Sequence, residues 1–346
     1  MKRPLVLLLL LFGALLVGPR LFQPETLHDN VILSLNGKTM GTSYSIRLVA
    51  DQMAADSEQL RDRIDGCLEH INDLMSTYRP ASELSRINQT PAHQWFALSP
   101  ETFGVLKAAQ QISKQSDGAF DITVGRLVNL WGFGPTINLQ HMPDAKEITR
   151  LRSALGHDRL QLRDDPPALL KAGKELALDL SAIAKGYGVD AVAQLLEQLG
   201  YHNYMVEIGG EIRTRGHKPG QQPWNIAIER PDVSGRVAQK ILHLTTTAMA
   251  TSGDYRNYFE QDGKRYSHTI DPRTGYPIEH RLASVSVLHD SCMMADGYAT
   301  ALMVLGPEAG MALAEELDLA VYMLVKDGDS FTSRRSSRFD KYLAAQ

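Results

Sequence analysis

Apolar and polar residues follow one another in patterns that predict both strands and helices. Residues 41–50 alternate apolar and polar positions, as in a strand with one buried face. Residues 56–78 repeat apolar side chains at three- and four-residue spacings, which predicts an amphipathic helix with a charged outer face. A second helix is expected to begin at Ser99, with Pro100 in the first turn, where proline is favoured.

Further strands and helices are expected between residue 176 and the C-terminal part of the chain. Residues 176–180 are expected to form a strand, Ser181 to cap a helix that Gly200 ends, and residues 204–208 to form the next strand. Strands and helices that do not strictly alternate favour an α+β fold around one main core. The remaining expected elements are strands over 224–230, 283–290 and 319–325, helices over 292–305 and 307–317, and a loop or hairpin over 266–278.

The N-terminus has the composition of a targeting segment. Lys2 and Arg3 precede an aliphatic run over residues 5–17, the length of a signal-peptide core and short of the roughly 20 residues that span a membrane. No cysteine follows the run to take a lipid, and both a cleaved signal peptide and an uncleaved anchor stay open for residues 1–22. Either way the body is expected to be exported. Residues 23–37 are interpreted as a linker and 38–346 as the folded domain.

Composition removes several classes of function. The formal net charge is −4 and no long basic run occurs, which argues against nucleic acid as a partner. The two cysteines, Cys67 and Cys292, lie far apart and in no CxxC pair, so they form neither a disulfide framework nor a zinc site. We expect two isolated buried thiols.

An acid and an alcohol interrupt the apolar segment 291–306. Asp296 and Thr300 are four residues apart, so their oxygens face the same side of a helix. Carboxylate and hydroxyl oxygens suit Mg²⁺, which takes few protein ligands and completes its shell with water and substrate phosphate. The alternative is that Asp296 caps the N-terminus of its own helix, where negative charge is favoured.

A second candidate stretch is LDLSAIAKGYG, residues 178–188. Asp179 ends the expected strand, and Lys185 lies near a helix N-terminus, where a cation is unfavourable unless an anion is nearby. A bound phosphate would supply that anion, whereas a solvated lysine is the plain alternative. The glycines fit neither GxGxxG nor the P-loop, so both of those readings are weak.

Aromatic residues and one histidine complete the candidates. Tyr78, Phe120 and Trp131 stand near turns and could line the slot of a flat ligand, or belong to the core. Asp121 could hydrogen-bond a heterocycle or cap a turn. His268, between Ser267 and Thr269, is a candidate general acid or base because imidazole titrates near neutrality, although a lone histidine is more often structural.

Taken together, these stretches resemble one family, the ApbE-type FAD:protein FMN transferases, which attach flavin in the bacterial periplasm. The resemblance runs in consistent order from about residue 38 to the C-terminus. The matching stretches are MGTSYSI (40–46), STYRPASELSRIN (76–88), GAFDITVG (118–125), LDLSAIAKGYGVD (178–190), VEIGGEIRTRG (206–216), ATSGDYRNYF (250–259), YSHTIDPRTGYPI (266–278) and ADGYATALMVLG (295–306).

The resemblance implies a fold and a reaction. The fold would be a single α+β body of the T-fold-like, ApbE type. The reaction would be Mg²⁺-dependent transfer of FMN from FAD to a Thr or Ser hydroxyl of an acceptor protein, with release of AMP. The acceptors would be domains of membrane redox complexes, and the enzyme would be periplasmic, touching the inner membrane only through its N-terminus. Two other activities stay open, an FAD pyrophosphatase and an FAD-storing protein.

Site residues carry over position by position. His268 and Asp296 are both candidates for the base that activates the acceptor hydroxyl. Some relatives have Asp at the position of Ala299, so one metal oxygen would be absent here. The implied FAD contacts are Met40, Tyr78, Ala119, Phe120, Asp121, Asp179, Lys185 and Ile270, and the implied metal ligands are the Ala182 carbonyl, Asp296 and Thr300.

Overall fold

The structure is a computed structural model of the chain and describes residues 30–51, 56–135, 142–231, 237–254, 258–261, 263–328 and 330–344. The expected targeting segment, residues 1–22, lies outside these ranges. Within them, no helix is both long enough and apolar enough to cross a membrane.

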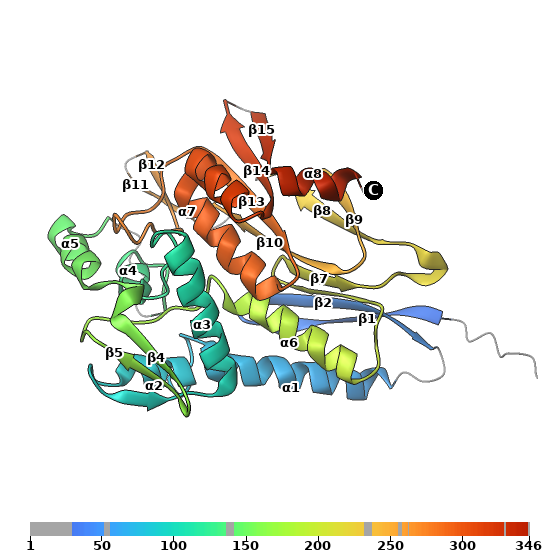
Figure 1. Cartoon of the computed structure of the whole chain (residues 1–346), viewed down its shortest axis with the longest axis horizontal. Coiled ribbons are helices and arrows are strands. Elements are labelled where there is room, and N and C mark those ends of the chain that lie inside the picture. The colour runs from blue at the N-terminus through green and yellow to red at the C-terminus, as the bar shows by residue number, and fades with distance from the viewer. Residues whose placement is uncertain are drawn as a thin grey trace, which may run out of the picture.

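The centre of the fold is an antiparallel sheet with the strand order β1-β2-β6-β7-β10-β13-β14-β15 (Figure 1). Strands β1 and β2 are joined by Met40 and Gly41, whose φ angles of 49° and 71° are those of a tight two-residue hairpin turn. The strands of this sheet are β1 (Asn30–Thr39), β2 (Thr42–Asp51), β6 (Tyr204–Ile208), β7 (Glu211–Arg215), β10 (Thr247–Gly253), β13 (Leu282–His289), β14 (Ala320–Asp327) and β15 (Ser330–Arg335).

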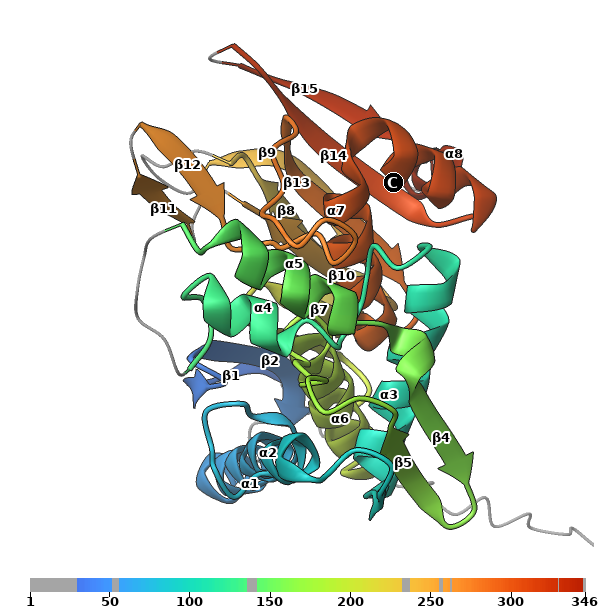
Figure 2. The ribbon, with the colours of Figure 1, turned by 90° about the vertical axis from the view of Figure 1, so that its left-hand side faces the viewer.

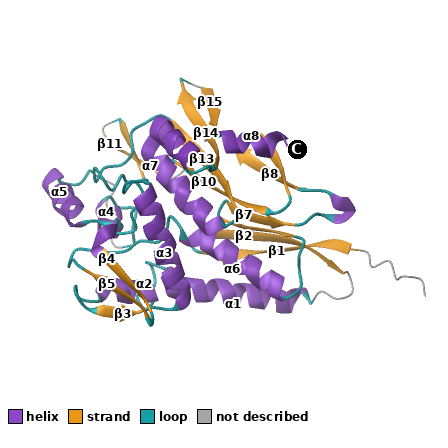
Figure 3. Ribbon diagram, viewed as in Figure 1, coloured by secondary structure: helices purple, strands orange, loops and turns teal. Residues whose placement is uncertain are grey.

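Both faces of the sheet are covered. Helices α1 (Ser57–Met75), α6 (Ala184–Gln198) and α7 (Cys292–Glu316) lie on one face, and α3 (Pro100–Gln115) packs against α7 (Figure 3). The β8–β9 hairpin (Trp224–Glu229, Ala238–Leu244) and α8 (Ser337–Ala344) cover the other face at β10, β13 and β14. Strands β13 and β14 are covered on both sides, so successive residues of each are buried, including Ser284 and Ser286 of β13.

Smaller elements surround this layer. Helix α4 lies beside α5, with the β11–β12 hairpin near one end of the pair (Figure 2). Trp131, directly after α4, is fully buried and donates its indole N–H to the carbonyl of Gly275 at 2.9 Å. These elements are α2 (Glu83–Gln89), α4 (Gly125–Leu130), α5 (Ala145–Ala154), β3 (Trp95–Ala97), β4 (Leu160–Asp164), β5 (Pro167–Lys171), β11 (Tyr258–Gln261) and β12 (Lys264–Ser267).

Most expected elements are confirmed, and three expectations are wrong. Residues 30–37 are not a linker, because they form most of β1. Residues 176–180 form no strand but an extended segment with one bridge, between Ala177 and Val124. Ser181 does not cap α6. This helix begins at Ala184, and its N-cap residue, Ile183, makes no side-chain hydrogen bond to it.

Candidate active site

A cavity of about 1530 Å³ opens where the β1–β2 turn, the C-terminal end of α1 and the starts of α6 and α7 converge. Every site residue that the family resemblance implies lines this cavity, although the residues come from six separate parts of the chain. They are Met40, Tyr78, Ala119, Phe120, Asp121, Asp179, Ala182, Lys185, His268, Ile270, Asp296 and Thr300.

Asp296 caps a helix, but not the one that carries it. The start of α7 is capped by Ser291, whose hydroxyl accepts from the amide of Met294. The Asp296 carboxylate instead accepts from the amide of Gly186, in the first turn of α6, at 2.9 Å. The expectation that Asp296 caps its own helix is therefore wrong, whereas the bound phosphate expected near Lys185 stays a prediction.

The two helices approach closely enough for this contact because residue 186 is glycine. A Cβ at this position would lie 2.4 Å from the carbonyl oxygen of Cys292 and 2.8 Å from the Cβ of Asp296. Asp296 is 4% exposed, and burial raises the pKa of its carboxyl, against the opposite effects of Lys185 and the Gly186 amide.

Lys185 is held by a carboxylate that the sequence analysis did not single out. Its ammonium lies 2.8 Å from Glu211 Oε1. Burial lowers the pKa of Lys185, but the charges of Glu211 and Asp296 outweigh it and hold the pKa above its usual value. Lys185 is therefore a fixed cation on the wall of the cavity, and the expectation of a solvated lysine is wrong.

Glu211 is 1% exposed and lines the same cavity. Burial raises its pKa to about 8, although Lys185 pulls it downward. Its second oxygen, Oε2, is buried without a hydrogen-bond partner in the described part of the chain. Glu211 stands in the quoted stretch VEIGGEIRTRG, but only the fold brings this strand residue to Lys185, so spacing along the sequence gave no signal.

Thr300 lies one turn after Asp296 on α7, and its hydroxyl is 3.2 Å from that of Ser252 on β10. Both hydroxyls line the cavity. The expected common orientation of Asp296 and Thr300 is confirmed.

Two further aspartates accept hydrogen bonds from backbone amides of the cavity wall. Asp121 accepts from the amides of Thr123 at 2.8 Å and His157 at 2.9 Å, so the structure supports its role as the cap of a turn. Asp179 accepts from the amide of Ser181 at 2.8 Å and holds the turn that contains Ala182. Both carboxylates are mostly buried, and their turns present backbone groups to the cavity.

The mouth and far wall of the cavity are more apolar. Tyr78 is 69% exposed, whereas Phe120 is buried in the wall. His268 follows β12 and packs edge-on against Phe133, with ring centroids 6.3 Å apart. Ile270 forms an isolated bridge with Pro277 within residues 266–278, which were expected to form a loop or hairpin. Trp131 belongs to the core and does not line the cavity.

The donor atoms fit a hard cation. The described ranges hold no cluster of three or more His, Cys, Asp or Glu side chains able to bind a metal. Two buried carboxylates, Asp296 and Glu211, nevertheless lie close enough to one lysine to raise its pKa, and Glu211 Oε2 is buried without a hydrogen-bond partner among the described residues. With the Thr300 hydroxyl these are oxygen donors, of the kind that Mg²⁺ takes together with substrate phosphate.

A cavity of this size, lined by basic residues such as Lys38 and Lys185, by buried acids and by the exposed ring of Tyr78, defines a protein that binds a large, partly anionic ligand. The chain belongs to the ApbE family, whose family model matches residues 40–323.

Similar proteins agree over nearly the whole chain. A relative from Vibrio cholerae serotype O1 named FAD:protein FMN transferase is 51% identical over 310 residues, 90% of this chain and 92% of the relative. One of the same name from Haemophilus influenzae is 43% identical over 337 residues, 96% of this chain and 97% of the relative. The solved structure of the flavin transferase ApbE from Vibrio cholerae superposes with a TM-score of 0.84 at 49% identity, covering 90% of this chain and 99% of that one.

The expected family and α+β fold are thus confirmed. The cysteines are free, as expected, but Cys67 is only partly buried. The roles of individual residues toward FAD or a metal stay predictions.

Proposed function

We propose that this chain is an FAD:protein FMN transferase, which moves FMN from FAD to a Thr or Ser hydroxyl of an acceptor protein. The observation that carries the proposal is the single cavity in which Lys185, Asp296 and Thr300 meet. The names of relatives that cover nine tenths or more of the chain support it.

The reaction requires one bond to form and one to break. The acceptor hydroxyl oxygen attacks the FMN-side phosphorus of FAD, the bond to the bridging oxygen breaks, and AMP leaves with that oxygen. Lys185, held by Glu211 on the cavity wall, would offset the negative charge of the pyrophosphate. Tyr78 and Phe120 supply aromatic surface for the rings of FAD.

A base must take the proton of the acceptor hydroxyl, which is a poor nucleophile by itself. The two candidates differ in the role that each already has in the proposal. Asp296 is proposed to hold the cation, whereas His268 lines the cavity wall on another element and is given no metal to bind. We therefore assign the proton transfer to His268.

We propose Mg²⁺ as the cation, held by Asp296, Thr300 and the carbonyl of Ala182. When bound, it would neutralise phosphate charge and polarise the bond to the leaving AMP. The oxygen donors and the excess of buried carboxylates support this choice.

The acceptors and the location are part of the proposal. A positively charged start followed by an apolar run supports export to the periplasm, with membrane contact through residues 1–22. Flavin-accepting domains of membrane redox complexes would then be the partners. The net charge of −4 argues against nucleic acid as a partner.

One incubation tests the reaction. The protein is mixed with FAD, Mg²⁺ and a recombinant flavin-accepting domain, or the same domain with its acceptor threonine replaced by valine. The domains are then analysed by intact mass spectrometry and the solution for AMP and FMN. Transfer predicts FMN on the threonine domain alone, with AMP released. AMP with free FMN and an unmodified domain would instead indicate a pyrophosphatase, and neither product would indicate FAD storage.

A further inference from the structure

We propose that Asp190 is a positioning residue of the transferase. Its carboxylate fixes the first turn of α7 against α6, and so sets where Asp296 and Thr300 stand toward the cation. The inference rests on the proposed function, because it assumes the metal site on α7.

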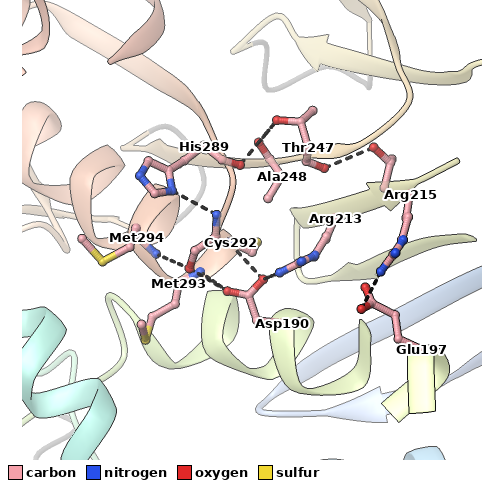
Figure 4. A network of polar contacts seen from close by, with 12 residues as sticks. Asp190, Glu197, Arg213, Arg215, Thr247, Ala248, His289, Cys292, Met293 and Met294 are labelled. Atoms are coloured by element: carbon pink, nitrogen blue, oxygen red, sulfur yellow. Dashed lines mark hydrogen bonds and ion pairs between the residues drawn. The ribbon is translucent and has the colours of Figure 1, made fainter. Parts of the chain in front are cut away.

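Asp190 lies on α6, and its side chain binds the start of α7 (Figure 4). One oxygen accepts from the amide of Cys292 at 3.0 Å. The other accepts from the amide of Met293 at 3.0 Å and from the hydroxyl of Ser291 at 2.8 Å. Asp190 thus satisfies the first two amides of α7 and also holds the residue that caps the third.

The two helices therefore cap one another. Asp190 of α6 accepts from the start of α7, while Asp296 of α7 accepts from the Gly186 amide at the start of α6. A carboxylate at a helix N-terminus interacts favourably with the partial positive charge there. A shift of α7 along α6 would break both contacts at once, so the pair defines one relative position of the helices.

Strand β7 of the central sheet fixes the same arrangement. Arg213 lies 2.6 Å from Asp190 Oδ1, and Glu211, two residues earlier, binds Lys185. Residues two apart on a strand face the same side, so β7 holds α6 at two points. Asp190 is accordingly shared between β7 and α7, whereas the cavity lining does not include it.

The chain offers a matched control in Glu197. It lies on the same helix and pairs with Arg215 of the same strand, at 2.5 Å, but it makes no contact with α7 among the described residues (Figure 4). Glu197→Gln therefore weakens the attachment of α6 to β7 without touching the start of α7. Asp190→Asn keeps the shape of the side chain but turns an amide N–H₂ toward groups that are themselves donors.

The test measures metal binding in the absence of acceptor. Mn²⁺, visible by electron paramagnetic resonance, is titrated into FAD-saturated protein, and FAD affinity is measured separately in EDTA. We expect Asp190→Asn to weaken Mn²⁺ binding about tenfold, as loss of a residue that orients a metal ligand does, with FAD affinity in EDTA unchanged. Glu197→Gln should bind both as the parent does.

Equal Mn²⁺ affinities for Asp190→Asn and the parent would overturn the inference, and so would equal losses in Asp190→Asn and Glu197→Gln. Asp296→Asn separates this result from the proposed function. If Asp296→Asn binds Mn²⁺ as the parent does, the proposed metal site itself is wrong. If only Asp296→Asn loses Mn²⁺, the positioning role alone fails.

Should Asp190→Asn not fold, as circular dichroism would reveal, Ser291→Ala replaces it. This variant removes one hydroxyl that links Asp190 to the Met294 amide. Weaker Mn²⁺ binding in Ser291→Ala supports the inference, and parent-like binding overturns it.

Discussion

Replacing Gly186 by alanine tests the close contact on which the site depends. The new Cβ would meet the carbonyl oxygen of Cys292 at 2.4 Å and its carbonyl carbon at 2.7 Å. These are backbone atoms of the first turn of α7, so no side-chain rotation relieves the overlap. Helices α6 and α7 would have to separate.

The expected cost has three parts. Overpacking of a tight contact costs about 1–3 kcal/mol. Separation also breaks the 2.9 Å hydrogen bond from the Gly186 amide to Asp296, and a hydrogen bond to a charged group contributes about 1.5–3 kcal/mol. Alanine regains about 1 kcal/mol over glycine inside a helix. We therefore expect the free energy of unfolding to fall by about 1.5–5 kcal/mol, and FMN transfer to slow because Asp296 moves.

The assay is denaturant unfolding monitored by circular dichroism, beside the transfer reaction. Gly104→Ala is the matched control, because Gly104 lies within α3 and a Cβ there meets nothing within 4 Å. This control should gain about 0.5–1 kcal/mol of stability. If Gly186→Ala were as stable and as active as Gly104→Ala, the proposed packing of α6 on α7 would be refuted.

Three further substitutions test separate parts of the site. Burial raises the pKa of Glu211 from 4.5 to about 8. Between these two pH values the folded chain keeps a proton that the unfolded chain has lost. The free energy of unfolding therefore falls as the pH rises from 4.5 to about 8. Denaturant midpoints of Glu211→Gln in metal-free buffer should lose that decline, and an unchanged pH slope would count against the assignment. Thr300→Val should raise the Mg²⁺ concentration for half-maximal transfer about tenfold, while Ser252→Ala, which removes only its hydroxyl partner, should not; equal effects would exclude Thr300 as a ligand. His268→Ala should slow single-turnover transfer about 10²- to 10⁴-fold with FAD binding unchanged, and an unchanged rate would remove His268 from the proton transfer.

Much of the fold was accessible from local patterns. Apolar residues at helical spacing, such as Ile64 and Leu68, predicted helix α1. The N-cap Ser99 and the first-turn Pro100 predicted the start of α3. Strand β1 was missed because its exposed edge position leaves Ile32 partly in solvent and weakens the apolar alternation. Segment 176–180 is apolar like a strand because it is buried, yet it crosses the core without a strand partner.

Some contacts of the site could likewise be predicted from the sequence, and others could not. Asp296 and Thr300 could be paired from their spacing because they share one helix. The partners of Lys185 and Asp190 could not, since Glu211 and Ser291 approach them only when β7, α6 and α7 pack together. For the same reason the sequence suggested that Asp296 caps its own helix, whereas the capped amide belongs to a helix that begins 112 residues earlier, at Ala184.

The most direct measurement is a crystal structure of the protein with FAD and Mn²⁺, in which anomalous scattering locates the metal. We expect one peak bound by the Asp296 carboxylate, the Thr300 hydroxyl and the Ala182 carbonyl, with the FAD pyrophosphate between this peak and Lys185. A peak bound by other residues, or FAD outside the cavity, would contradict this expectation.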